Sequence, residues 1–237
     1  MKILVQPPRS WLMRVGVWAL VILVCSLVIL AMKRWVVEGY EVPSTSMQPT
    51  FRPGDRVWVN KLAYFGGAVP RRGDIVVFPQ PRTGTLFVKR VVGLPGERIT
   101  VLGRQVFIGD RPMENLKVSQ RDPEVSFWGS AWPANAYLGW ATMSDTGANY
   151  RVLLPPISLA TWRLSGTWRV PEGRVFVMGD ARDDSSDSRA WGSVAIESII
   201  GEVFCRVDAG ARSTHAQPER TNCHPDLPLD PGLSVAQ

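Results

Sequence analysis

One uninterrupted apolar run near the N-terminus limits most strongly what this chain can fold into. Residues 15–32 read VGVWALVILVCSLVILAM, with Arg14 before them and Lys33 and Arg34 after them. At about 1.5 Å per residue, a helix of this length nearly matches a hydrocarbon core about 30 Å thick. Tryptophans near both ends suit the two membrane interfaces. The run therefore predicts a membrane-spanning helix.

Two other interpretations of this run are a buried helix and a cleaved signal peptide. A buried helix of a globular domain is rarely apolar on every face. A cleaved signal usually has about 7–15 apolar residues followed by small ones, whereas this run ends in Met32, Lys33 and Arg34. We therefore expect a retained anchor. Basic residues on the two flanks are nearly balanced, so charge favours a cytoplasmic N-terminus only weakly.

The overall charge and the cysteines narrow the class of protein. The chain has 237 residues, with 27 Lys and Arg against 21 Asp and Glu, and no block of charge of the kind that clamps nucleic acid. The three cysteines lack the C-x-x-C spacing of zinc and thioredoxin-like sites. Cys25 lies inside the apolar run. Cys205 and Cys223 could form a disulfide if the domain is exported, and the sequence leaves this open.

Behind the apolar run the chain has the pattern of a β protein. Short stretches rich in β-branched and aromatic residues recur between turn residues. The predicted strands are residues 56–59, 74–78, 86–92, 98–101, 105–108, 174–177 and 200–207. No sustained helical period lies between them, so we expect a mostly β fold of antiparallel sheets or a barrel-like sandwich.

Composition divides the chain into five predicted segments. A central stretch is rich in Trp, Pro, Ser and Gly, which suggests an inserted cap, and the tail is polar and proline-rich, which suggests disorder. The predicted segments are 1–37 with the anchor, 38–103 as the first part of a catalytic core, 104–172 as the cap, 173–208 as the second part of the core, and 209–237 as the tail.

Several common kinds of active site are excluded by the residues present. The only histidines, His215 and His224, lie in the predicted tail, so a Ser-His or Cys-His pair is not expected. No GxSxG, P-loop or HExxH motif is present. The acidic stretch 180–189 lacks the glycine and the closing glutamate of a calcium loop. We therefore expect no metal site.

Lys89 is a candidate general base. It lies in the strand-like run LFVKRVVGL, where neighbouring side chains point to opposite faces. Lys89 and Arg90 therefore point apart, and one of them is expected to face inward. A buried lysine tends to release its proton, and a neutral amine can act as a base. The alternative is a lysine at a strand edge whose ammonium group reaches water.

The segment PSTSMQPT, residues 43–50, offers a candidate nucleophile. Ser44 and Ser46 lie on a stretch fenced by prolines just after the apolar run. A serine needs a base to become nucleophilic, and this chain offers lysine for that task. Aromatic residues that follow closely, namely Phe51, Trp58 and Tyr64, suggest a catalytic surface at the membrane interface. The alternative is a polar linker.

Four motifs in a fixed order connect these candidates. After the apolar run come PSTSMQPT, RGDIVVF at 72–78, VKRVVGLPG at 88–96 and GDARDDSSDSR at 179–189. This order resembles bacterial type I signal peptidase, the leader peptidase family, over the body of the chain from about Glu41 to Val207 outside the cap. Ala181 and Glu97 depart from the family pattern, which usually has asparagine and aspartate there.

The resemblance implies a role for each matched position. Ser46 would be the nucleophile and Lys89 the general base. Ser44 would help the Ser46 backbone N–H to stabilise the oxyanion, and Ser185 would orient the Lys89 amine. Four further residues would support the loop that carries Ser185: Asp180, Arg182, Asp187 and Arg189.

The resemblance also implies the fold, the reaction and the location. It implies antiparallel sheets with an inserted cap, and a protease that removes signal peptides from exported preproteins without a metal or organic cofactor. The partners would be signal sequences, bound as extended strands, membrane lipid and the nearby secretion machinery, but not nucleic acid. A single-pass protein of the plasma membrane is expected, with a cytoplasmic N-terminus and the catalytic domain on the periplasmic or extracellular face.

Two other functions remain possible from the sequence. The first is an anchored adaptor that has lost catalysis, although a scaffold needs none of Ser44, Ser46, Lys89 and Ser185. The second is a self-cleaving Ser-Lys repressor, but such proteins begin with a DNA-binding helical domain where this chain has an apolar run.

Overall fold

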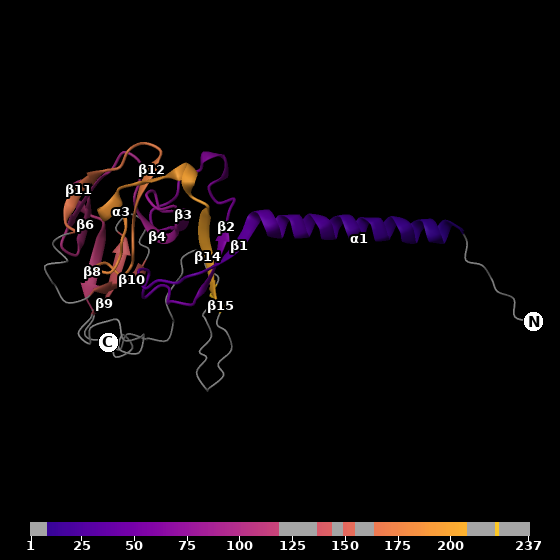
Figure 1. Cartoon of the computed structure of the whole chain (residues 1–237), viewed down its shortest axis with the longest axis horizontal. Coiled ribbons are helices and arrows are strands. Elements are labelled where there is room, and N and C mark those ends of the chain that lie inside the picture. Colours follow the sequence, from indigo (N-terminus) through magenta and orange to yellow (C-terminus); the bar gives the residue numbers. More distant parts are fainter. Residues whose placement is uncertain (1–8, 119–136, 144–148, 155–163, 208–220, 223–237) are drawn as a thin grey trace, which may run out of the picture. The chain divides into compact units, whose positions relative to one another are not determined.

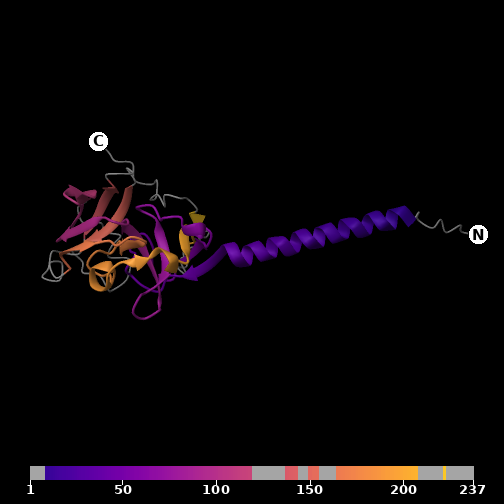
Figure 2. The same cartoon turned by 90° about the horizontal axis from the view of Figure 1, so that it is seen from above.

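The computed structural model describes residues 9–118, 137–143, 149–154, 164–207 and 221–222. The chain forms two compact units, Met1–Glu38 and Gly39–Gln237. The first contains helix α1 (Arg9–Val36), which is unbroken in Figure 1 and Figure 2. Its stretch Met13–Leu30 has a mean hydropathy of 2.5, and none of these residues is buried. The predicted apolar helix is confirmed, and it is long enough to cross a membrane.

The largest sheet has eight strands, with the order β1-β2-β14-β3-β4-β12-β13 and β15 paired with β14. From β2 to β13, and between β14 and β15, neighbouring strands of this sheet pair antiparallel. Its strands are β1 (Val37–Glu41), β2 (Arg56–Asn60), β3 (Ile75–Pro79), β4 (Leu86–Gly93), β12 (Arg174–Met178), β13 (Val194–Ala195), β14 (Gly201–Val207) and β15 (Thr221–Asn222).

Two smaller antiparallel sheets lie between β4 and β12 in the sequence. One has the order β11-β5-β6-β7, with β5 (Arg98–Leu102), β6 (Gln105–Ile108), β7 (Arg111–Pro112) and β11 (Gly166–Arg169). The other has the order β10-β9-β8, with β8 (Glu114–Val118), β9 (Tyr137–Met143) and β10 (Asn149–Leu154). The short helices are η1 (Phe65–Gly67), α3 (Ser188–Trp191) and η3 (Ile196–Ser198).

The predicted mostly β fold is confirmed. Each of the seven predicted strands coincides with an observed strand, and their ends differ by a single residue at most. The segment boundaries that we proposed, including the cap at 104–172, remain predictions. Most of the tail after residue 208 lies outside the described residues. Thr221 and Asn222 were expected in that disordered tail, but they form β15 against Val207 and Arg206.

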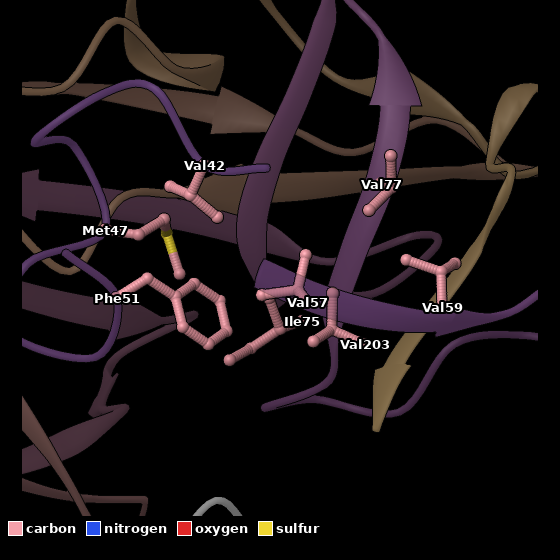
Figure 3. Packing of buried hydrophobic residues seen from close by; sticks show 8 residues of the cluster. All are labelled: Val42, Met47, Phe51, Val57, Val59, Ile75, Val77 and Val203. Atoms are coloured by element: carbon pink, nitrogen blue, oxygen red, sulfur yellow. The ribbon is translucent and has the colours of Figure 1, made fainter. Parts of the chain in front are cut away.

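One apolar cluster of the main sheet fixes the segment that holds Ser46. Eight buried residues form it (Figure 3): Val42, Met47, Phe51, Val57, Val59, Ile75, Val77 and Val203. Met47 and Phe51 come from the loop between β1 and β2, whereas Val57 and Val59 form the inward face of β2. Burying a side chain of this size contributes about 1.5–3 kcal/mol. Residues on both sides of Ser46 therefore anchor this loop in the core.

The cysteines differ in state. Cys205, on β14, is disulfide-bonded, whereas Cys25, on α1, is free and exposed. Cys223, which the sequence offered as a partner for Cys205, lies outside the described residues.

Candidate active site

The loop that holds Ser46 is a compact turn with hydrogen bonds of its own. The Gln48 amide donates to the Thr45 carbonyl at 2.9 Å, and the Phe51 amide donates to the Met47 carbonyl at 2.9 Å. Ser46 itself is buried, with 8% of its surface exposed. The alternative of a loose polar linker is therefore wrong for this segment.

Lys89 reaches this loop from β4. In the sheet it pairs with Val76 of β3, and its Nζ donates a hydrogen bond to Ser46 Oγ at 2.5 Å. Only 3% of the residue is exposed, which excludes a lysine that reaches water at a strand edge. The structure thus brings together the two residues that the sequence proposed as nucleophile and base.

Burial governs the ionisation of Lys89. Loss of hydration lowers the pKa of its amine from 10.5 to about 8, because the charged form is poorly solvated there. The carboxylates of Asp187, Asp180 and Asp184 oppose this shift, and the Arg189 charge adds to it. With this pKa about a tenth of the amine is neutral at pH 7 and about half at pH 8, whereas a free lysine is almost fully charged, so the neutral form that a general base requires is available.

Ser44 lies beside the nucleophile on the solvent side. Its Oγ is 3.1 Å from Ser46 Oγ, and the Ser44 residue is exposed. The next residue is fixed to the opposite loop, since Thr45 Oγ1 donates to Asp184 Oδ2 at 2.7 Å. The position of Ser44 suits the role proposed for it in stabilising an oxyanion, which remains a proposal.

Ser185 lies next to the Ser46 loop, but its hydroxyl does not make the expected bond. A Cβ atom added at Gly179 would collide with Ser185 Oγ and with the Ser46 carbonyl oxygen, so these groups are closely packed. The buried Ser185 Oγ has no hydrogen-bond partner in the described part of the chain. Lys89 donates instead to Ser46, and an orienting role for Ser185 stays a proposal.

Asp187 and Arg189 form a buried ion pair behind this loop. Arg189 Nε donates to Asp187 Oδ1 and its Nη2 to Asp187 Oδ2, each at 2.8 Å. Asp187 also accepts from the Gly179 amide at 3.0 Å and caps α3. Arg189 Nη2 reaches the Arg182 carbonyl at 2.5 Å. The pair therefore holds this loop at Gly179 and at Arg182.

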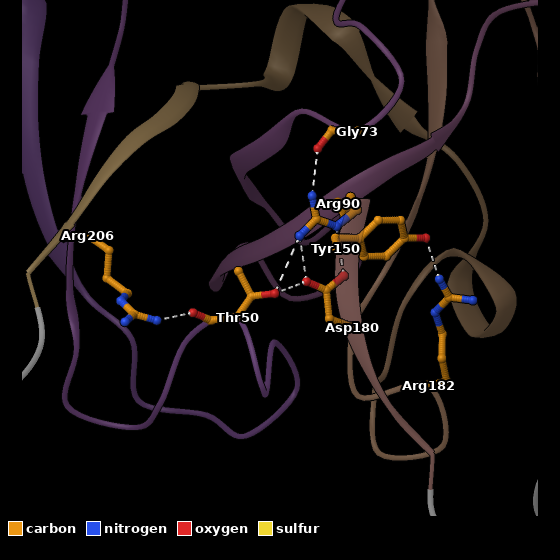
Figure 4. Close-up of polar contacts among 7 residues, drawn as sticks. All are labelled: Thr50, Gly73, Arg90, Tyr150, Asp180, Arg182 and Arg206. Carbon is orange, nitrogen blue, oxygen red and sulfur yellow. Dashed lines mark hydrogen bonds and ion pairs between the residues drawn. The ribbon is translucent and has the colours of Figure 1, made fainter. Parts of the chain in front are cut away.

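Asp180 and Arg182 belong to a second polar group, shown in Figure 4. Arg90 Nε and Nη2 donate to the two carboxylate oxygens of Asp180 at 2.8 and 2.7 Å, and Thr50 Oγ1 also donates to Asp180. Arg182 Nη2 donates to the Tyr150 hydroxyl at 2.7 Å. Sequence reasoning did not predict these roles for Thr50, Arg90 or Tyr150.

The two departures from the family pattern fit the structure. Glu97 accepts hydrogen bonds from Arg72 Nη1 and Nη2 at 3.0 and 2.7 Å and from the Leu94 amide at 2.7 Å. Ala181 is buried, and its amide donates to the Ser46 carbonyl at 3.1 Å. This contact uses only the backbone, so it does not require an asparagine side chain.

Comparisons with known proteins agree with one another. A family described as signal peptidase, peptidase S26, matches residues 15–207. A signal peptidase I of Pseudomonas fluorescens is 32% identical over 200 residues, which cover 75% of this chain and 66% of that protein. A signal peptidase I of Bacillus caldolyticus is 31% identical, with 80% and 88% covered.

A solved structure is also similar. The signal peptidase I of Enterococcus faecalis V583 is 28% identical, and the match covers 56% of this chain and 96% of that chain with a TM-score of 0.32. The Pseudomonas protein is longer than the matched region, so this chain spans about two thirds of its length.

Proposed function

Since this chain belongs to the signal peptidase family, peptidase S26, we propose that it is a membrane-anchored serine endopeptidase that removes signal peptides from exported preproteins. One observation supports the chemistry above all others. Lys89 Nζ lies 2.5 Å from Ser46 Oγ in a buried site where the lysine has a pKa of about 8. Ser46 would act as the nucleophile and Lys89 as the general base.

The proposed reaction uses the neutral form of Lys89. Its amine would take the Ser46 proton as Oγ attacks the scissile carbonyl. Ser44 Oγ, 3.1 Å from the nucleophile, would donate to the oxyanion that forms. The Lys89 ammonium would then give its proton to the leaving amine, so that the peptide bond breaks and an acyl-enzyme remains. Water activated by the same amine would release the acyl group and regenerate Ser46.

The loop from Gly179 to Ser185 would keep the nucleophile in place. The Ala181 amide holds the Ser46 carbonyl, and the Gly179 amide is held by Asp187. A preorganised site of this kind avoids the cost of ordering its groups during the reaction. We propose that Asp187 and Arg189 act through this loop and do not touch the substrate.

The substrate and the location follow from the family and from α1. A signal sequence would bind as an extended strand, with small side chains next to the cleavage site. The apolar stretch Met13–Leu30 would anchor the enzyme in the plasma membrane. We propose a cytoplasmic N-terminus and a catalytic unit on the outer face, near the secretion machinery, where preproteins emerge.

The deciding experiment is cleavage of a preprotein by the detergent-extracted full-length chain. We expect one cut after a small residue at the end of the signal sequence. Ser46→Ala and Lys89→Met should each abolish the cut. An anchored adaptor would bind preproteins without cutting them, and a self-cleaving repressor would cut only its own chain. Either result would exclude the proposed function.

A further inference from the structure

Tyr150 lies between two arginines of the family motifs, although it comes from outside those motifs. It belongs to β10, in the sheet formed with β9 and β8, and only 4% of it is exposed. The Arg90 guanidinium lies over its ring, 4.3 Å from the centroid, and the Arg182 guanidinium is 5.9 Å from it. Figure 4 shows the ring beside Arg90 with its hydroxyl directed at Arg182.

In addition to the Asp180 carboxylate, the aromatic face of Tyr150 attracts the arginine charges. Arg90 is buried and donates to both oxygens of Asp180, of which Oδ2 also accepts from Thr50. Arg182 donates to the Tyr150 hydroxyl at 2.7 Å. An aromatic face attracts cations, and this attraction is strongest where water is excluded. Tyr150 therefore stabilises two buried guanidinium groups at once.

The backbone of β10 holds the same loop. The Leu153 amide donates to the Asp180 carbonyl at 3.0 Å, and the Leu153 carbonyl accepts from the Arg182 amide at 3.2 Å. Between these two contacts, the Ala181 amide donates to the Ser46 carbonyl. The stretch that fixes the nucleophile's backbone is thus itself attached to β10.

We propose that Tyr150 is a positioning residue for the Ser46 and Lys89 pair, and that it acts through Arg90, Asp180 and Arg182. Arg90 follows Lys89 on β4, so a shift of its side chain is transmitted to the strand that carries the amine. Asp180 precedes the amide that holds Ser46. This inference rests on the proposed function, because it assigns Tyr150 to the same site.

Removing the ring should also change the charges around Lys89. Asp180 acts on the Lys89 amine together with Asp187, Asp184 and Arg189. If Arg90 is held less firmly, the Asp180 charge is less well neutralised and favours the ammonium form. Water that enters beside Arg90 acts in the same direction. Both effects raise the pH at which Lys89 loses its proton.

The test compares three variants of the full-length chain in detergent. Tyr150→Leu removes the ring face, whereas Tyr150→Phe keeps the face and loses only the hydroxyl. Val152→Ala is the control for stability, since Val152 is buried on the same strand within the apolar cluster of β9 and β10. For each variant, kcat, KM and the melting temperature are measured on a preprotein, and kcat is followed against pH.

We expect kcat of Tyr150→Leu to fall about tenfold with KM little changed, which corresponds to about 1.4 kcal/mol of transition-state stabilisation. The acidic limb of its pH profile should move to higher pH. In Tyr150→Phe the acidic limb should stay at the wild-type pH, and most of kcat should remain. An unchanged kcat and limb in Tyr150→Leu would overturn the proposal. So would an equal loss of kcat in a Val152→Ala protein of matched melting temperature.

A second readout does not depend on cleavage. The chain has only five lysines, so nitrogen-labelled lysine allows the Lys89 amine to be titrated by NMR and assigned with Lys89→Met. We expect a higher midpoint in Tyr150→Leu than in the wild type. If the wild type does not cut preproteins but the midpoint still moves, the proposed function fails and the positioning role stands. An unmoved midpoint contradicts the positioning role.

Discussion

Lys89 and Arg90 are neighbours on β4 whose side chains point to opposite faces, and both are buried. Lys89 Nζ contacts Ser46 Oγ, whereas the Arg90 guanidinium contacts Asp180. The alternation of strand side chains predicted that they point apart, but it predicted only one of them inside. Arg90 stays charged because Asp180 neutralises it, whereas Lys89 forms no ion pair within the part of the chain that the structure describes. Because of this difference, Arg90 is suited to a structural role and Lys89 to proton transfer.

Ser46→Ala should abolish processing of a preprotein without unfolding the enzyme. The substitution removes one hydroxyl from a loop whose position is fixed by Met47 and Phe51 in the core. The measurement is cleavage by the purified full-length variant, with thermal unfolding as the control for folding. A Ser46→Ala enzyme that cuts at the wild-type rate would show that another group is the nucleophile.

Lys89→Arg should be as inactive as Lys89→Ala, because arginine cannot lose its proton in a protein. In the wild type, kcat/KM should rise with pH and level off above about 8, the pKa that burial gives the Lys89 amine. The measurement is a pH–rate profile from about pH 6 to 10, a range that brackets this pKa. A flat profile, or activity in Lys89→Arg, would remove Lys89 from the mechanism.

Local sequence patterns predicted the two residues that meet in the candidate active site, and most of the main sheet. Valine-rich runs between glycine and proline turns are strong strand signals, and all seven runs proposed from them are strands. Ser46 and Lys89 could be proposed as nucleophile and base because each lies in a short motif of consecutive residues. Thr50 and Arg90 lie inside these motifs, but their bonds to Asp180 join distant segments, which spacing alone does not reveal.

Strands β8, β9 and β10 were not predicted, because they lie in the stretch rich in Trp, Pro, Ser and Gly that suggested an inserted cap without indicating its strands. Gly139 and Ala141 have low strand propensity, and the pairing of β9 with β10 depends on contacts between segments. The contact of Tyr150 with Arg90 has no local signal either. Ser185 was predicted to bond with Lys89, but the Lys89 amine donates to Ser46 in this structure.

The surface that contacts the membrane should differ from the one expected from the sequence. Phe51 was expected there, but it is fully buried in the core, and Tyr64 is half-buried and donates to Asp74 at 2.9 Å. Trp58 is 40% exposed and Phe65 is 82% exposed. We therefore expect these two side chains to enter the membrane interface.

A protein lacking residues 1–37 should still bind lipid vesicles and cut a peptide. Phe65→Ser should weaken vesicle binding about tenfold, which corresponds to the transfer free energy of a large apolar side chain that is only partly inserted. Leu102→Ser is the matched control, because Leu102 is 54% exposed on β5 of another sheet. Equal vesicle binding by the wild type and by both Trp58→Ser and Phe65→Ser would exclude this surface.

Lys89→Met should stabilise the folded chain at pH 7 while abolishing cleavage. At pH 7 and below the Lys89 amine is mostly protonated in both states, so the folded state bears nearly the full cost of a buried charge. Between about pH 8 and 10.5 the unfolded state keeps the proton that the folded state has lost, so the free energy of unfolding rises with pH. Above this range both states are neutral and the cost is gone.

Methionine removes this cost at every pH, so its advantage over lysine should be on the order of 1–3 kcal/mol at pH 7. The advantage should shrink as the pH rises from about 8 to 10.5. Urea unfolding at pH 7 and pH 10 measures it, with Lys61→Met as the control at a partly exposed lysine. A Lys89→Met advantage that is larger at pH 10 than at pH 7 would mean that the folded state does not lower the pKa of Lys89.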